Sequence, residues 1–100
     1  MAIQLSVTQF GGKVFVYANN TSSDHVAYID YIILLFDTEL GSWGKWFYQD
    51  DFYFGSGRLG EGSGARMVEF NYPGGPASAH ATAKYWEVDQ SAKSLPVNVS

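Results

Sequence analysis

The sequence contains no cysteine among its 100 residues. Disulfide frameworks, thiolate zinc sites and cysteine nucleophiles are therefore excluded. Basic residues are also scarce, because 6 Lys and Arg stand against 10 Asp and Glu, which gives a formal net charge of -4. A nucleic-acid binder needs a basic patch to neutralise phosphates, so we expect no nucleic-acid partner.

Long apolar runs are missing as well. The longest, residues 26–36, contains Asp30 and is too short to span a bilayer, so we expect no transmembrane segment. Residues 1–4 lack the basic start and apolar run of a signal peptide. The localisation therefore stays open between the cytosol, export by another route, and a start that has been trimmed.

Aromatic residues are abundant, at 17% of the chain, and apolar and polar residues alternate along much of it. Period-two alternation is typical of half-buried strands. We expect strands over residues 3–8, 13–18, 26–36, 45–54, 66–72 and 78–88, and a short edge strand over 96–100. Six or seven strands without a helical segment predict a soluble all-β chain, a small antiparallel β-sandwich that forms one domain over residues 1–100.

Two of these strands carry specific expectations about faces. In residues 26–36, Val26, Tyr28, Ile32 and Leu34 are expected on one face, and Ala27, Ile29, Ile33 and Leu35 on the other. In residues 78–88, a small apolar face is expected from Ala79, Ala81, Ala83 and Tyr85. The apolar character of both faces of residues 26–36 predicts a central strand.

An aromatic block is the most unusual feature of the chain. Seven rings lie within twelve positions: Trp43, Trp46, Phe47, Tyr48, Phe52, Tyr53 and Phe54. Strict alternation predicts one face with Trp46, Tyr48, Phe52 and Phe54, and another with Phe47 and Tyr53. We expect Trp43 and Trp86 to be exposed, and Trp46 and Tyr48 to lie in the core. The alternative is a tightly packed aromatic core with one bulge near Asp50.

No combination of residues predicts catalysis. Neither His25 nor His80 has a nucleophile placed beside it, and Asp50 and Asp51 would point to opposite faces of a strand. Asp37 and Glu39 could contribute to a calcium site, but no dedicated calcium loop is present, so we expect no metal. Residues 55–60 match a dinucleotide glycine pattern without a helix to follow, so we expect no cofactor.

One family resemblance is carried by several short motifs. A strand from Val14 leads to Asn19-Asn20-Thr21-Ser22, and a long strand then ends in Leu34-Leu35-Phe36-Asp37. Leu59-Gly60-Glu61 and a strand over residues 82–88 follow. This order, over residues 11–88, resembles FxLYD-type and related immunoglobulin-like domains, although Leu59 stands where a proline is usual. The resemblance implies an immunoglobulin-like sandwich and a non-catalytic role, and it implies no specific ligand.

These features favour a small lectin-like, carbohydrate-binding module. Exposed rings stack on sugar C–H faces, while carboxylates and amides bond the hydroxyl groups. The candidate ligand-binding residues are Trp43, Asp50, Asp51, Trp86, Asn20 and His80. The alternative is a structural or assembly module, such as a surface filament, phage decoration or adhesin domain, whose rings meet another protein surface. A membrane-lytic sandwich is a third hypothesis.

Few lysines protect the strand edges, so we also expect a homo-oligomer, specifically a homodimer.

Overall fold

The computed structural model describes residues 3–38, 41–53, 55–72, 78–87 and 93–97. The strands, in chain order, are β1 (Ile3–Phe10), β2 (Lys13–Asn20), β3 (Ala27–Thr38), β4 (Gly41–Tyr48), β5 (Arg58–Leu59), β6 (Gly64–Asn71), β7 (Ser78–Glu87) and β8 (Lys93–Val97). A 3-10 turn, η1 (Gln49–Asp51), follows β4. None of the described residues forms a helix that is long and apolar enough to cross a membrane.

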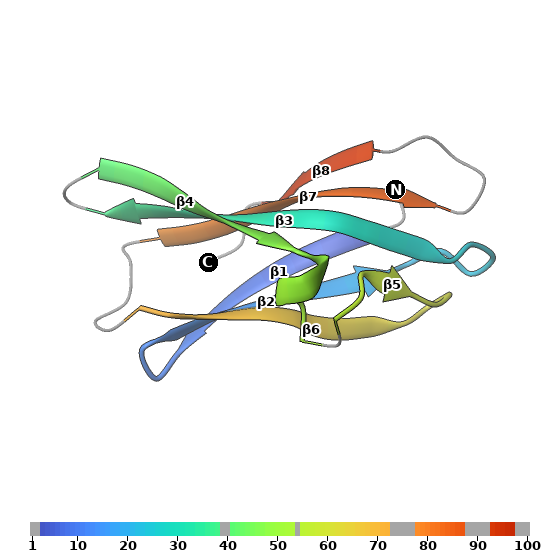
Figure 1. The fold of residues 1–100 in the computed structure, drawn as a ribbon, viewed down its shortest axis with the longest axis horizontal. Helices are drawn as coiled ribbons and strands as arrows, with labels where there is room; N and C mark the ends of the chain where they lie inside the picture. The colour runs from blue at the N-terminus through green and yellow to red at the C-terminus, as the bar shows by residue number, and fades with distance from the viewer. Residues whose placement is uncertain (1–2, 39–40, 54, 73–77, 88–92, 98–100) are drawn as a thin grey trace.

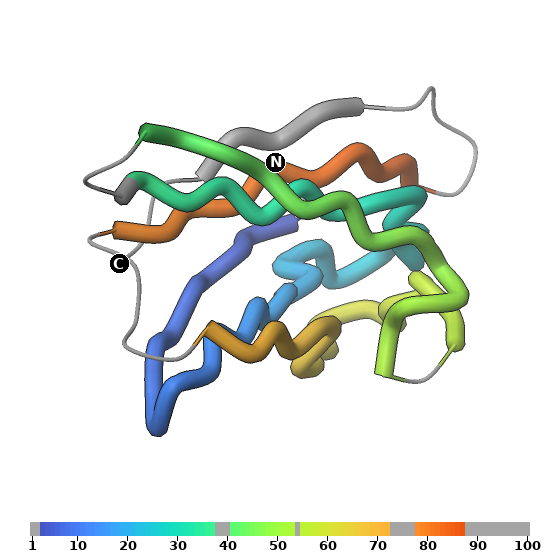
Figure 2. Tube along the Cα trace, turned by 60° about the vertical axis from the view of Figure 1, so that its left-hand side comes forward, coloured from blue at the N-terminus to red at the C-terminus, as the bar shows by residue number. Residues whose placement is uncertain are grey.

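The strands form two antiparallel sheets that lie face to face. The first sheet has the order β1-β2-β6, and the second has the order β4-β3-β7-β8, with β5 paired to the far end of β3. Figures 1 and 2 show the two layers, with the longer β3 at the centre of its sheet. The predicted antiparallel β-sandwich and the central position of β3 are therefore confirmed.

The core lies between the sheets and follows the alternation of the strands. Ile3, Leu5 and Val7 of β1 are buried, and the polar residues between them are exposed. The predicted small apolar face of β7 is also confirmed, because all of its members are buried: Ala79, Ala81, Ala83 and Tyr85. Full burial of a side chain as large as Tyr85 or Ile3 contributes roughly 1.5–3 kcal/mol to folding.

A β-bulge in β3 overturns the predicted division of its faces. The register with β7 shifts between Ile29 and Tyr31, so Asp30 is an extra residue on this strand. Alternation therefore changes phase at Asp30, and Ala27 and Ile29 share the buried face with Ile32, Leu34 and Phe36. The prediction that grouped Tyr28 with Ile32 was wrong because strict alternation cannot anticipate a bulge.

The strand predicted over residues 45–54 is also shorter and earlier than expected. β4 begins at Gly41 and ends at Tyr48, where η1 interrupts it. Phe47 and Phe52, predicted on opposite faces, are both buried on either side of this turn. Trp46 and Tyr48, predicted in the core, are 47% and 54% exposed, so that prediction was wrong. Phe54 lies outside the described residues.

The remaining boundaries differ by a few residues. The five glycines of residues 55–64 predict a loop, but this segment contains the two-residue strand β5. The last strand lies at Lys93–Val97 instead of 96–100. The sequence Pro73-Gly74-Gly75-Pro76 predicts a turn, and these residues lie outside the described ones. None of these differences changes the layers of the sandwich.

Candidate functional site

The outer face of the larger sheet carries a surface of rings and aliphatic side chains. Tyr31 on β3 lies opposite Tyr48 on β4, and Ile33 lies opposite Trp46. These positions alternate with buried ones, so their side chains point away from the core. We call this surface the aromatic face, and its members are Tyr28, Tyr31, Ile33, Leu35, Trp46, Tyr48 and Trp86.

Three rings of the aromatic face lie in contact at its β4 side. The centroids of Tyr31 and Trp46 are 4.9 Å apart, and those of Trp46 and Tyr48 are 6.3 Å apart with an interplanar angle of 21°. Contacts of this kind hold aromatic side chains in defined orientations. About half of the surface of Trp46 and of Tyr48 remains open to solvent. The three rings form a preorganised and accessible platform.

A shallow hollow of about 230 Å³ lies at the end of this platform, lined by Asp30, Tyr48, Gln49 and Asp50. The β3 bulge supplies Asp30, and the turn η1 supplies Gln49 and Asp50. Asp51 holds the turn in place, because its Oδ2 accepts a hydrogen bond of 2.9 Å from the backbone N–H of Tyr48. Carboxylate and amide oxygens accept hydrogen bonds from hydroxyl groups. Tyr48 belongs to both the platform and the hollow.

The residues predicted to bind a ligand do not form one cluster. Asp50 lines the hollow, and Asp51 supports the turn. Trp86 lies on the aromatic face, where it stacks on Tyr28 at 5.6 Å with an interplanar angle of 16°. It is partly buried instead of exposed as predicted, and the stacked Tyr28 ring covers one of its faces. His80 is on the same face beside Leu35, six residues and therefore about 20 Å from Trp86.

Trp43 lies on the other side of β4, toward the interior of the sandwich. It is opposite Phe36, and their ring centroids are 4.6 Å apart. It also stacks on Tyr72 at 5.8 Å and meets Phe70 edge-on. Trp43 is 42% exposed, so its predicted exposure is confirmed, but its contacts close one end of the core.

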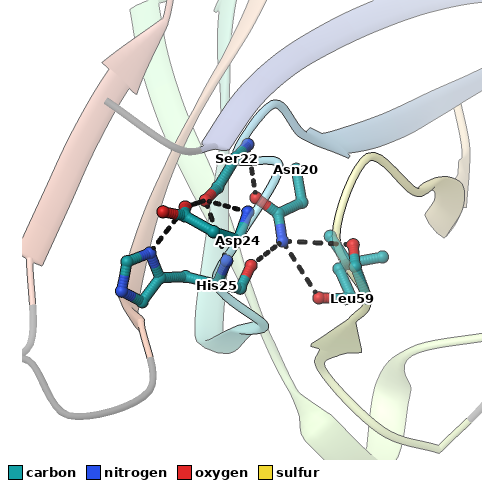
Figure 3. A network of polar contacts seen from close by, with 6 residues as sticks. Asn20, Ser22, Asp24, His25 and Leu59 are labelled. Carbon is teal, nitrogen blue, oxygen red and sulfur yellow. Dashed lines mark hydrogen bonds and ion pairs between the residues drawn. The ribbon is translucent and has the colours of Figure 1, made fainter.

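Asn20 has a structural role. Its side chain is fully buried, and its Nδ2 lies 2.9 Å from the carbonyl oxygen of His25 and 3.1 Å from those of Leu59 and Gly60. Its Oδ1 accepts a hydrogen bond of 3.0 Å from the backbone N–H of Ser22. Figure 3 shows how this amide joins the β2–β3 connection to the segment around β5. The amide is occupied within the protein, so Asn20 does not belong to the candidate site.

A polar cluster surrounds His25 in the connection between β2 and β3. The Ser22 hydroxyl donates to Asp24 Oδ1 at 2.9 Å, and His25 Nδ1 lies 2.9 Å from the same oxygen. The Ser22 hydrogen bond, followed by that of His25, lowers the pKa of Asp24 below its ordinary 3.8. The hydroxyl donates to the carboxylate, whereas a nucleophile would donate to the imidazole.

Asp37 is held by two hydroxyl groups on neighbouring strands. Ser42 Oγ donates to its Oδ1 at 2.6 Å, and Ser78 Oγ donates to its Oδ2 at 2.9 Å. These bonds, in that order, and the nearby His80 lower the pKa of Asp37 below 3.8. Glu39, its predicted calcium partner, lies outside the described residues. In the part of the chain that the structure describes, no three His, Asp or Glu side chains are grouped as metal ligands.

A larger hollow, of about 530 Å³, lies on the outer face of the smaller sheet. We call it the polar groove, and its lining includes Gln4, Ser6, Tyr17, Asn19 and Arg66. The Arg66 guanidinium lies 5.1 Å from the ring centroid of Phe15 and 5.4 Å from that of Tyr53. Arg66 also lies 4.0 Å from Glu69. The positive charge of Arg66 thus already contacts two rings and a carboxylate of the protein. Tyr17 is the aromatic residue among those that line the polar groove.

Sequence reasoning missed the exposure of Trp46 and Tyr48 and the grouping of Tyr48 with Asp30. The available signal was the polar run Gln49-Asp50-Asp51 inside the aromatic block, which favours a turn over a continuous strand. If the strand ends at Tyr48, alternation no longer assigns Trp46 and Tyr48 to the same face as Phe52.

Comparisons with protein families, with curated protein sequences and with solved structures give no match for this chain.

Proposed function

We propose that this protein is a non-catalytic carbohydrate-binding module and that the aromatic face with its adjoining hollow is the binding site. The observation that carries the proposal is the position of Tyr48, whose exposed ring continues the Trp46 platform and also lines the hollow beside Asp30 and Asp50. A sugar ring on the platform would place hydroxyl groups near acceptors that point from the bulge and from the turn.

The chemistry of a sugar suits both halves of this site. Its C–H faces are apolar and stack on aromatic rings, and its hydroxyl groups donate to carboxylates. Ionised carboxylates accept hydrogen bonds without needing a metal or a cofactor. In the Ser22–Asp24–His25 cluster, the Ser22 hydroxyl donates to the Asp24 carboxylate and accepts from the backbone N–H of His25, and this arrangement supports the non-catalytic part of the proposal.

The experiment compares ring deletions on the two outer faces. Purified protein is tested for binding to a glycan array and to insoluble polysaccharides, and the affinity of a hit is measured by calorimetry. We expect Trp46→Ala and Tyr48→Ala each to weaken binding by roughly 1–3 kcal/mol, which is about 5- to 150-fold. The melting temperature should change little, because neither ring lies in the core and about half of the surface of each is exposed.

Tyr17→Ala is the matched control, since Tyr17 is 40% exposed in the polar groove of the opposite sheet. It should leave the affinity unchanged. An array without binding, or binding that is lost in Tyr17→Ala and kept in Trp46→Ala, would contradict the proposed site.

An assembly module of immunoglobulin-like type is the second candidate function. The observation that favours it is the long exposed edge of β4, of which Phe47 is the one buried residue. This candidate predicts self-association in the absence of any sugar.

A further inference from the structure

The edges of the two sheets differ in how they are protected from pairing with another chain. β6 contains the extra residue of a bulge opposite β2, and its Met67 carbonyl accepts a hydrogen bond of 2.8 Å from the Tyr53 N–H. β8 contains Pro96, which has no N–H to donate. β1 packs against β7 and β8. Bulges, prolines and covering segments are the usual means of blocking an edge.

Among the residues that the structure describes, β4 has none of these three protections. Its register with β3 runs from Gly41 to Tyr48 without a shift, and its sequence contains no proline and one charged residue, Lys45. Tyr48 ends the edge, because its N–H donates to Asp51. An exposed and regular edge of this length is a template for a further strand.

The hydrogen bond at Tyr48 identifies the groups that this edge presents. In an antiparallel pair, a residue directs its N–H and C=O either both toward the partner strand or both away from it, in alternation. The Tyr48 N–H reaches Asp51, so Tyr48 is directed away from β3. Alternation along the unbroken register then directs the backbone N–H and C=O groups of Ser42, Gly44 and Trp46 away from β3 as well.

We propose that a second copy of this chain pairs antiparallel with β4, with Gly44 of one copy opposite Gly44 of the other. This register places Ser42 opposite Trp46 of the second copy. Each of the three residues whose backbone groups point away from β3 then faces another such residue of the second copy. A shift by two residues in one direction places Ser42 opposite Tyr48, whose N–H is already bonded to Asp51. A shift in the other direction moves Trp46 beyond the end of β4.

The side chains are complementary in the same register. Trp43 of one copy lies directly opposite Lys45 of the other, on the face of β4 that points toward the interior of the sandwich. The Lys45 ammonium already lies over a ring within its own chain, 6.0 Å from the centroid of Phe47. A lysine opposite an accessible tryptophan can form a cation–π contact, and the two-fold axis repeats it. The two Lys45 side chains are diagonal to each other and are kept apart.

The two-fold axis of such a pair is perpendicular to the sheet, so the outer faces of both copies lie on the same side. The two aromatic faces then join across the β4–β4 junction. If the proposed carbohydrate site is correct, one long polysaccharide chain can contact both copies. The dimer itself does not depend on that function.

The absence of cysteine allows a direct test of the register. In the proposed register Trp43 and Lys45 occupy a non-hydrogen-bonded position, where opposite Cα atoms are about 4.5 Å apart, whereas diagonal residues are about 7–8 Å apart. A disulfide needs a Cα separation below about 6.8 Å. Lys45→Cys and Trp43→Cys proteins should therefore cross-link rapidly when mixed under mild oxidation, and slowly when each is oxidised alone.

A mixture of Lys45→Cys with Ser6→Cys, whose cysteine lies on the opposite sheet, measures random collisions. Sedimentation of the unmodified protein should show a species of twice 11.0 kDa at tens of micromolar, an order-of-magnitude choice for a modest interface. Lys45→Glu should raise its dissociation constant about ten-fold, because a carboxylate is repelled by the ring face. A monomer throughout, or faster cross-linking of Lys45→Cys alone than of the mixture, would overturn the proposal.

Discussion

Two adjacent asparagines at the end of β2 have opposite environments. Asn19 is exposed at the polar groove, whereas Asn20 is fully buried and its amide contacts three carbonyl oxygens from two segments. A buried polar group that loses its partner costs the full penalty of its desolvation. The same residue type therefore contributes very differently to the stability of the fold at two successive positions.

We expect Asn20→Ala to lower the free energy of unfolding by roughly 3 kcal/mol, because it leaves buried carbonyls without a donor. Asn19→Ala should change it by less than about 0.5 kcal/mol. Urea denaturation followed by fluorescence measures both values. Equal effects of the two substitutions would show that the Asn20 network does not stabilise the fold.

At the scale of elements, the β1–β2 hairpin is set by its two-residue turn. Gly11 and Gly12 join the paired residues Phe10 and Lys13, and their φ angles are +61° and +76°. Two successive positive φ angles are typical of a type I′ turn, whose twist matches that of the flanking strands. A Cβ atom added at Gly11 would meet no atom within 4 Å, so only its backbone conformation disfavours other residues.

This turn gives a clean test of backbone conformation. Gly11→Val should lower the free energy of unfolding by about 1–2 kcal/mol, because a β-branched residue resists the left-handed region. Gly11→Asn should cost clearly less, since asparagine tolerates this region. Thermal melting of both variants distinguishes them, and an equal loss would argue against a conformational cause.

The strands that sequence reasoning placed correctly are those with unbroken alternation. β1 and β7 have no bulge within their alternating runs of buried residues, so their core faces could be predicted from sequence alone. The bulge at Asp30 and the turn at Gln49–Asp51 change the phase. The bulge appears in the pairing with β7, which is distant in sequence, whereas the turn is held by the local hydrogen bond between Asp51 and the Tyr48 N–H. The abundance of exposed rings could be predicted, but the identity of the exposed rings depended on these two interruptions.

At the scale of the whole molecule, the two outer faces have different chemistry. The smaller sheet presents polar side chains and the Lys13–Glu69 ion pair, at 3.1 Å, whereas the larger sheet presents the aromatic face. The hypotheses of a sugar on the aromatic face and of a second copy on β4 therefore both concern the larger sheet. Variants on one sheet serve as controls for variants on the other.

The central position of β3 has a consequence for the speed of folding. β3 forms a local hairpin with β4, but its other neighbour, β7, is distant in sequence, as the pairing of Asp37 with Ser78 shows. Chain entropy must be lost before such a distant contact can form, so domains with many of them fold within milliseconds to seconds. We expect stopped-flow refolding in that range, and refolding within microseconds would contradict it. Until β7 docks, the nascent chain holds its most apolar strand with one edge open, which makes the interval before that docking the period of greatest risk of misassembly.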